Sequence, residues 1–329
     1  MRVAILDDYQ LVAQRLADWT KLGPDAEIVS FDRHFGSTDE AVSELAGFDV
    51  VCGLRERTPF TRELLERLPR LKLIVFTGSR SRAVDVAAAA ELGIPVARTG
   101  GILPPRPGYS SIVELSFAFI LACTRNLCAD NRLMHGGAWT SGIGATLRGK
   151  KLGLLGFGRV GSSMVPVAEA FGMEVLAWSE NLTPERAAAG NATAVSKETL
   201  FCESDVISVH LRLSDRTVGL VGAAEFRMMK PSAILVNTAR GPIVDEAALI
   251  EALSQQRIRA YAADVHHVEP LPADHPLQRL DNAIMTPHIG YLSEKNLSDN
   301  YPLMVDQIVA WQRGDALHLF TGDDGTRAG

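Results

Sequence analysis

A glycine-rich hexapeptide places the tightest constraint on how this chain can fold. The segment Gly156-Phe157-Gly158-Arg159-Val160-Gly161 follows the apolar run KLGLL and precedes a helical stretch that ends near AFGM. In such a strand–loop–helix unit the first glycine permits a tight turn, the second lets backbone approach a pyrophosphate, and the third lets helix pack on strand. The helix N-terminus adds N–H donors for the anion. The segment therefore predicts a dinucleotide-binding βαβ unit, with an ordinary βα turn as the alternative.

Short apolar runs alternate with amphipathic segments on both sides of this loop. We expect strands at VAILDD, EIVSFD, DVVCGL, LKLIVF and IPVART, and then near 151–155, 174–178, 205–210, 233–238, 259–265 and 282–286. Regular alternation of this kind is typical of parallel sheets covered by helices. We predict an α/β protein with two Rossmann-like domains, of which the first is a flavodoxin-like substrate domain.

A stretch rich in Gly and Pro at 100–108 marks a crossing between these domains. The segment from about 109 to 134 is predicted to be one extended helix, and the chain after His288 becomes helical again. We expect this last helix to return to the first domain. The predicted limits are 1–101 plus 290–329 for the substrate domain and 102–289 for the dinucleotide-binding Rossmann domain, with two crossovers that act as hinges.

The net charge and the positions of the cysteines limit the kinds of partner and the location that we expect. The net charge of -6 arises from interspersed acids and bases, so we expect no nucleic-acid partner. No apolar stretch is long enough to span a bilayer, and the N-terminus lacks the features of a secretory signal. The four cysteines are scattered, lack metal-ligand spacing and mostly have apolar neighbours, which is typical of buried, reduced thiols. We therefore expect a cytoplasmic protein with no metal and no membrane partner.

The residues after the strand EVLAW bear on the choice of cofactor. An acid at this strand end would bind the adenosine ribose of NAD, whereas NADP would favour a nearby arginine. Ser179 occupies the position, Glu180 follows it, and Arg186 is the closest arginine. We expect NAD, with Ser179 and Glu180 at the ribose. NADP, or a polar turn without a ligand role, remains the alternative.

Three motifs follow predicted strands of the second domain, on the side where open α/β sheets bind ligands. AILVNTARGPIVDEAAL presents Arg240, whose paired donors suit a carboxylate or carbonyl, although a lone arginine is more often solvated surface. AYAADVHHVEPLP presents Asp264 and then Glu269, and AIMTPHIGY presents His288.

His288 and Glu269 form the expected acid–base pair. Histidine exchanges protons near neutral pH, and a carboxylate such as Glu269 would fix its tautomer. That pair suits hydride transfer at a carbon that bears oxygen. His210 ends the strand DVISVH and is a further candidate at the cofactor, whereas His266, His267 and His275 are interpreted as surface or packing residues.

These motifs, in this order, resemble the D-isomer-specific 2-hydroxyacid dehydrogenases, which include D-glycerate, D-lactate, formate and 3-phosphoglycerate dehydrogenases. The resemblance covers nearly the whole chain and rests on LRERTPFT, TGSRSRAVD, GKKLGLLGFGRVG, SVHLRLSDRTVGL, VNTARGPIVDEAAL, DVHHVEPLP and TPHIGY. It implies hydride transfer between a nicotinamide cofactor and a small D-2-hydroxy or 2-keto acid, of the glyoxylate, hydroxypyruvate or phosphoglycerate kind. It also implies a homodimer formed through the helix near 109–134.

The resemblance assigns roles to individual positions. It implies that Arg240 binds the substrate carboxylate and carbonyl, that His288 is the acid–base, and that Glu269 supports it. It implies that Asp264 contacts the nicotinamide carboxamide and that N–H groups of the loop at Gly78 and Ser79 receive the substrate carboxylate. Besides the glycine loop, Ser179, Glu180 and Asp264, we expect His210, Thr217, Thr238 and Gly290 at the cofactor. Besides Arg240, His288, Gly78 and Ser79, we expect Arg55, in a neighbouring loop, at the substrate.

The chain departs from the family pattern at several positions. Arg212 stands where proline is common, and Ser179 stands where many members have an acid. The substrate loop adds Arg80 and Arg82 near Arg55, which suggests either an anionic or larger substrate or solvated surface arginines. A second class of function also remains open, an NAD(H)-sensing interaction protein, because transcriptional corepressors that resemble this family use the fold to bind dinucleotide and partners. The lack of a long disordered extension favours the enzyme.

Overall fold

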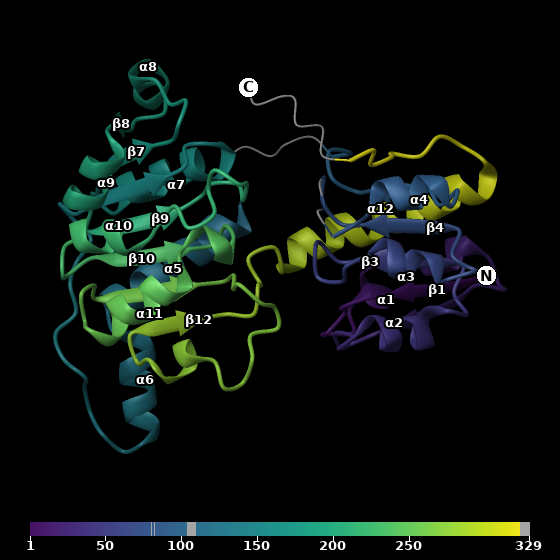
Figure 1. The fold of residues 1–329 in the computed structure, drawn as a ribbon, viewed down its shortest axis with the longest axis horizontal. Coiled ribbons are helices and arrows are strands. Elements are labelled where there is room, and N and C mark those ends of the chain that lie inside the picture. Colours follow the sequence, from purple (N-terminus) through teal and green to yellow (C-terminus); the bar gives the residue numbers. More distant parts are fainter. Residues whose placement is uncertain (80, 82, 104–109, 323–329) are drawn as a thin grey trace. The chain divides into compact units, whose positions relative to one another are not determined.

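The protein is described here from a computed structural model, which covers residues 1–79, 81, 83–103 and 110–322 (Figure 1). Its internal contacts divide the chain into two compact units. Unit 1 contains Met1–Pro107 and Ser293–Gly329, and unit 2 contains Gly108–Leu292. The chain thus leaves unit 1 and returns to it after unit 2 is complete.

Unit 1 is built on a five-stranded parallel sheet in the order β2-β1-β3-β4-β5. The strands are β1 (Arg2–Ile5), β2 (Glu27–Ser30), β3 (Val50–Gly53), β4 (Leu73–Phe76) and β5 (Val96–Arg98). Every residue of β3 and β4 is buried, as expected for apolar strands covered by helices on both faces. This strand order is the flavodoxin-like one, which confirms the predicted fold class for this part.

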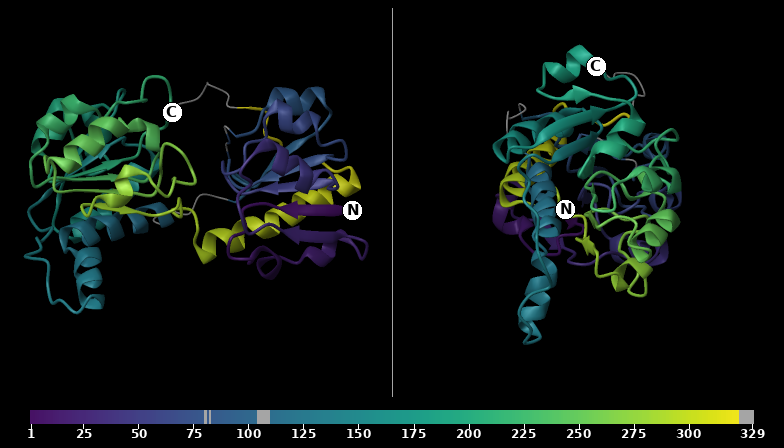
Figure 2. Two further views of the ribbon diagram at one scale, coloured as in Figure 1. Left: turned by 60° about the horizontal axis from the view of Figure 1, so that its bottom comes forward. Right: turned by 90° about the vertical axis from the view of Figure 1, so that its left-hand side faces the viewer.

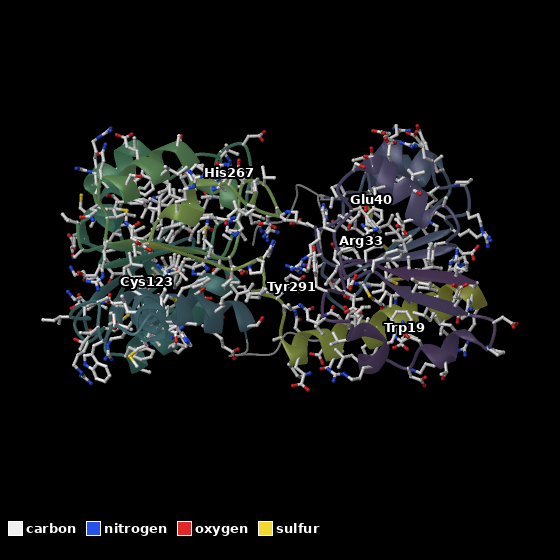
Figure 3. All side chains as sticks on the ribbon, turned by 90° about the horizontal axis from the view of Figure 1, so that it is seen from below. Trp19, Arg33, Glu40, Cys123, His267 and Tyr291 are labelled. Atoms are coloured by element: carbon white, nitrogen blue, oxygen red, sulfur yellow. The ribbon has the colours of Figure 1, made fainter. Side chains whose placement is uncertain are left out.

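Helices surround the sheet of unit 1. They are α1 (Ala13–Leu16), the 3-10 turn η1 (Trp19–Leu22), α2 (Thr38–Leu45), α3 (Arg62–Glu66), α4 (Val86–Glu91) and α12 (Glu294–Arg313). Side chains cap several N-termini, as Ser37 does for α2 and Asp85 for α4. The C-terminal α12 packs against α1, η1, β4 and β5, and Trp19 lies beside it (Figure 3). The last helix therefore completes the core of a sheet that forms from the N-terminal third.

Unit 2 contains a seven-stranded parallel sheet in the order β12-β11-β10-β9-β6-β7-β8. Its strands are β6 (Lys151–Leu155), β7 (Glu174–Trp178), β8 (Thr193–Ala194), β9 (Val206–Val209), β10 (Ile234–Asn237), β11 (Ala260–Ala263) and β12 (Ala283–Met285). Six of these match the predicted strands, and the two-residue β8 was not predicted because it has no apolar run of its own. The sheet confirms the second Rossmann-like fold.

The helices of unit 2 pack on both faces of this sheet and leave two hydrophobic clusters between the layers. They are α5 (Ser111–Thr124), α6 (Leu127–His135), α7 (Arg159–Ala170), α8 (Pro184–Ala188), α9 (Lys197–Glu203), α10 (Ala223–Met228) and α11 (Glu246–Ser254), with 3-10 turns η2 (Gly241–Ile243) and η3 (Pro276–Arg279). Strand order reverses between β6 and β9, and ligands of open α/β sheets bind at the carboxyl side of such a switch point.

The prediction of one extended helix over 109–134 is wrong. Two helices, α5 and α6, meet at a 64° bend, and Asn126 between them has a left-handed backbone with φ of 57°. Asparagine adopts this conformation more readily than other non-glycine residues, and its side-chain oxygen accepts a 2.8 Å hydrogen bond from Arg259. The polar residues Thr124, Arg125 and Asn126 interrupt the apolar ones, but Leu127 and Cys128 follow directly, so the periodicity did not reveal the break. Residue 109 lies outside the described residues.

The same helix pair bears on membrane insertion. Among the described residues, no single helix is long and apolar enough to cross a bilayer, and α5 with α6 reaches that length and composition only as a bent pair. The apolar residues of α5 are core residues of unit 2, because Val113, Phe117 and Ile120 are buried against the sheet.

The expectation that the cysteines are mostly buried holds for only half of them. Cys52 and Cys123 are buried, and burial raises the pKa of each thiol to about 12. Figure 3 shows Cys123 among the packed side chains of unit 2. Cys128 and Cys202 are exposed, because α6 buries none of its residues and α9 turns Cys202 toward solvent.

Candidate active site

The glycine loop lies at the switch point of the unit 2 sheet. Gly156 follows β6 with φ of 110°, and a Cβ atom there would lie 2.7 Å from the carbonyl carbon of His210. A Cβ atom on Gly161 would lie 2.1 Å from the carbonyl oxygen of Gly156. The first and third glycines therefore bring β6, β9 and α7 closer than any side chain permits.

Gly158 differs from these two glycines. It is exposed, and a Cβ atom there would have nothing within 4 Å. It forms the N-cap of α7, where no side chain caps the N–H groups of the first turn, which begins at Arg159 and Val160. Open space in front of uncapped donors is the environment that a pyrophosphate requires. The residues of the loop thus fit a dinucleotide, and Gly158 would be the residue that its pyrophosphate approaches.

The predicted ribose contacts lie beside this loop. Ser179 and Glu180 follow β7, the strand paired with β6, and Glu180 is exposed. The carbonyl oxygen of Ser179 accepts a 2.9 Å hydrogen bond from the N–H of Leu182, so this segment is a turn. Arg186 lies on the short helix α8, where its side chain is also exposed.

Arg240 is held by a buried amide. Asn237 ends β10 and is fully buried; its Nδ2 donates to the carbonyl of Arg240 at 2.9 Å, and its Oδ1 accepts from the N–H of Ala239 at 3.0 Å. The Arg240 guanidinium donates to the carbonyl of Ala239 at 2.7 Å. A Cβ atom on Gly241 would lie 2.2 Å from the carbonyl carbon of His266. The loops after β10 and β11 are therefore in direct contact.

Glu269 and His288 form the predicted pair. Oε2 of Glu269 lies 2.6 Å from Nδ1 of His288, and the two side chains are 33% and 18% exposed. The other carboxylate oxygen accepts a 2.9 Å hydrogen bond from the N–H of His266. Burial disfavours the charge, but the hydrogen bonds and charge of His288 and His266 outweigh it and lower the pKa of Glu269. Tyr291 packs edge-on to the His288 ring, with centroids 6.0 Å apart.

Asp264, the first residue after β11, is 1% exposed. Its carboxylate accepts hydrogen bonds from the N–H of Ile289 at 2.7 Å and of Gly290 at 2.6 Å, and from the hydroxyl of Thr286. The carbonyl of Gly290 accepts from Ser111 at 2.7 Å. The segment that carries His288 is thus fixed on both sides.

The other predicted cofactor residues also lie along the carboxyl edge of the unit 2 sheet. His210 follows β9, its ring lies 2.9 Å from Ser208, and burial lowers its pKa to about 4, so the ring is neutral at pH 7. The hydroxyl of Thr217 donates to the carbonyl of Arg212 at 2.7 Å and closes a turn. Thr238 follows β10, and its hydroxyl lies 3.0 Å from that of Ser116.

Unit 1 carries the predicted substrate residues at its own carboxyl edge. Arg55 follows β3 with φ of 61°, and a Cβ atom on Gly78 would lie 2.6 Å from its guanidinium. Gly78 follows β4, and its N–H donates to Thr99 at 3.2 Å, while the carbonyl of Ser79 accepts from Arg98 at 2.7 Å. Arg80 and Arg82 lie outside the described residues.

Two supporting residues escaped the sequence analysis. Asn237 looked like part of a strand, and His266 was interpreted as a surface or packing residue. His266 is buried, its N–H holds Glu269, and its ring lies 3.0 Å from the carbonyl of Thr286. Their signal in the sequence is a polar side chain inside a motif, at the end of an apolar strand for Asn237 and three residues beyond one for His266.

The Glu269 carboxylate makes a testable contribution to stability. Its lowered pKa means that the folded state holds the charged form more strongly than the unfolded chain does, so the stabilisation is present above the ordinary glutamate value of 4.5 and is lost as pH falls through the lowered value. We expect Glu269→Gln to be less stable than the parent at about pH 6, with the difference vanishing toward about pH 3. Urea unfolding across this range measures it. If the difference in free energy of unfolding between Glu269→Gln and the parent did not change with pH, the pairing would be contradicted. In a protein that already carries His288→Gln, adding Glu269→Gln should cause a smaller loss of stability.

The glycine loop yields a second prediction. Gly158→Ala fills open space and should lower the free energy of unfolding by no more than about 1 kcal/mol, because alanine is a poorer N-cap residue than glycine. It should nevertheless weaken NADH binding at least about tenfold, because a methyl group would stand where the pyrophosphate approaches. Calorimetric titration with NADH and thermal unfolding test both halves. Gly161→Ala is the contrasting variant, which should lose far more stability, because its Cβ atom would lie 2.1 Å from the carbonyl oxygen of Gly156. Unchanged NADH affinity in Gly158→Ala would refute this placement of the pyrophosphate.

Comparison with known proteins agrees with this geometry. Residues 117–290 match the family model described as "D-isomer specific 2-hydroxyacid dehydrogenase, NAD binding domain". The chain is 30% identical to a hydroxypyruvate reductase of Blautia hydrogenotrophica over 97% of this chain and 99% of that one, and 36% identical to a glyoxylate reductase of Aeropyrum pernix over 77% and 76%. A solved phosphoglycerate oxidoreductase of Vibrio cholerae superposes with a TM-score of 0.88 at 32% identity, covering 95% of this chain and 99% of the other.

The family match spans more than half of the chain and includes the glycine loop, Arg240, Glu269 and His288. The chain belongs to the D-isomer-specific 2-hydroxyacid dehydrogenase family, as the sequence motifs predicted, and is an NAD-linked oxidoreductase that acts on a CH–OH group.

Proposed function

We propose that Arg240, Glu269 and His288 carry out the substrate chemistry of this dehydrogenase. The observation that carries the proposal is the 2.6 Å contact between Glu269 and Nδ1 of His288, at the same sheet edge as the glycine loop. Because Glu269 engages Nδ1, we assign proton exchange with the substrate oxygen to Nε2, on the opposite side of the ring. Arg240 would bind the substrate carboxylate through its paired donors. When bound, NAD(H) accepts or supplies the hydride.

The substrate we propose is a small 2-keto acid or D-2-hydroxy acid of the glyoxylate or hydroxypyruvate kind. The names of the two reductases above support this class, and one of them aligns over nearly the full length of both chains. Unit 1 would act as the substrate domain, with Arg55, Gly78 and Ser79 at the substrate carboxylate, and unit 2 as the dinucleotide domain. Since the N–H of Gly78 already donates to Thr99, Arg55 and the N–H of Ser79 would make most of the contribution of unit 1 to that binding, beside Arg240 of unit 2.

We also propose that NAD is preferred over NADP. Glu180 lies two residues beyond the end of β7, where its carboxylate would accept hydrogen bonds from the ribose hydroxyls and repel a 2′-phosphate. The family model describes an NAD-binding domain, which supports this choice. A cytoplasmic location remains our proposal, based on the scattered, unpaired cysteines. The rival interpretation as a corepressor-like protein gains no support, since the relatives named above are enzymes.

The proposed partner in assembly is a second copy of this chain. α6 and the loop after it extend away from the sheet of unit 2 (Figure 2). This segment exposes large apolar side chains: Leu127 is 54%, Met134 53%, Trp139 80% and Ile143 95% exposed. Exposed apolar side chains concentrated on one projection are typical of an interaction surface. A symmetric pair would bury two such projections at once, because the same patch is used by both copies.

An activity panel tests the proposed chemistry. We expect glyoxylate and hydroxypyruvate to be reduced with NADH faster than with NADPH, and His288→Gln to lower kcat/KM at least about a hundredfold. The matched control is His275→Gln, because His275 also lies beside a carboxylate, 3.3 Å from Glu246, but caps the turn η3. Tight NADH binding without turnover of any 2-keto acid would instead favour a binding protein. A strong preference for NADPH would refute the role of Glu180.

Sedimentation velocity tests the proposed dimer. The parent chain should sediment as a dimer at micromolar concentration, and the double substitution Trp139→Ser with Ile143→Ser should shift it toward the monomer, because both side chains lose their apolar contacts. Leu92→Ser, at a 43% exposed leucine of unit 1, is the control and should leave the dimer intact. A monomeric parent would exclude the proposal, as would a dimer that survives the double substitution.

A further inference from the structure

The carboxylate of Asp264 is buried without a cationic partner among the described residues. Only 1% of the residue is exposed, and its carboxylate accepts hydrogen bonds from three uncharged donors. Two of these are the successive backbone N–H groups of Ile289 and Gly290, and the third is the hydroxyl of Thr286. Successive N–H groups that converge in a turn form a concave anion site. Asp264 fills this site from the neighbouring strand end.

The turn it fills is a strained one. His288 has φ of 55°, a left-handed backbone conformation that residues other than glycine seldom adopt. Its N–H donates to the carbonyl of Thr286 at 3.0 Å, so the backbone reverses within a few residues of β12. Strain of this kind persists only where surrounding contacts impose it, and it concentrates at functional positions. The hydrogen bonds from both sides of His288 to Asp264 supply that constraint.

We propose that Asp264 is a positioning residue for His288: its carboxylate holds the turn 286–290 in the strained form that sets the imidazole against Glu269. The contact is specific for a carboxylate, since Oδ1 accepts from Thr286 and Ile289 while Oδ2 accepts from Gly290. An amide would place an NH2 group against one of these donors. Gly290 allows the same contact, because a Cβ atom on this residue would lie only 2.9 Å from Oδ2 of Asp264.

This role differs from the one that the family resemblance implies for this position, which is contact with the nicotinamide carboxamide. Both carboxylate oxygens are already engaged with the turn, and almost none of the residue is accessible. The two roles predict different losses. Removal of a nicotinamide contact would weaken cofactor binding, whereas release of the turn would impair the proton exchange at His288 and leave cofactor affinity nearly unchanged.

Asp264→Asn separates these possibilities. Hydrogen–deuterium exchange followed by mass spectrometry should show faster exchange in the peptide spanning 286–292, by at least about tenfold, because hydrogen bonds to a charged group are lost. The peptide spanning 156–161 should be unchanged. At saturating NADH, kcat should fall at least about tenfold, while the Kd for NADH measured by calorimetry stays within about threefold. Asp281→Asn is the matched control, because Asp281 lies in the same unit but is 91% exposed.

A milder pair of variants covers the case in which Asp264→Asn fails to fold. Thr286→Val removes one donor and should show the same exchange and kcat changes at smaller size, and Thr286→Ser should restore the parent values because it returns the hydroxyl. Unchanged hydrogen–deuterium exchange of the peptide 286–292 in Asp264→Asn would overturn the proposal. So would a large rise in the Kd for NADH with kcat preserved.

The inference rests on the proposed role of His288 as the acid–base, and the two fail in different ways. If the parent enzyme reduces no 2-keto acid, the proposed function fails, yet the exchange experiment still reports whether Asp264 holds the turn. If turnover is present and His288→Gln abolishes it while Asp264→Asn changes neither exchange nor kcat, only the positioning role fails.

Discussion

The parallel register of β10, β11 and β12 is the constraint on which the site depends. Asn237 pairs with Ala263, and Ala263 pairs with Met285, so the three strands end level with one another. Each strand is followed by a short loop at the same edge of the sheet, and these loops carry Arg240, Glu269 and His288. A one-residue slip in register would reverse which side chains face each layer and would separate these loops. The apolar strand residues thus determine where the polar groups in the loops lie.

Buried polar groups then convert this coarse alignment into defined geometry. Asn237 ties the Arg240 loop, the N–H of His266 orients Glu269, and Asp264 ties the His288 turn. A buried polar group left without a partner costs about 1–3 kcal/mol, so each of these contacts strongly favours one loop conformation over the alternatives. The network is local to unit 2, and every member lies at or just beyond the end of a strand.

The strands were the most predictable part of the fold. β-branched runs such as VVCG and LIVF are long enough and apolar enough to be recognised as strands buried on both faces. The break at Asn126 was not predicted from periodicity, because apolar residues resume directly after it at Leu127, and a single left-handed residue changes the backbone without changing that pattern. β8 was missed for the opposite reason, since two residues carry no pattern at all.

The sequence by itself determined the chemistry available to this protein: the glycine loop, the three motifs with Arg240, Glu269 and His288, and the alternation that makes parallel sheets. These are local properties, set by residue type and spacing. Only the tertiary structure decided which polar groups meet, because Asp264 and Gly290 are 26 residues apart in the chain yet bonded across a strand end. Register, burial and the strained backbone of His288 arise from packing between distant segments, and no single segment encodes them.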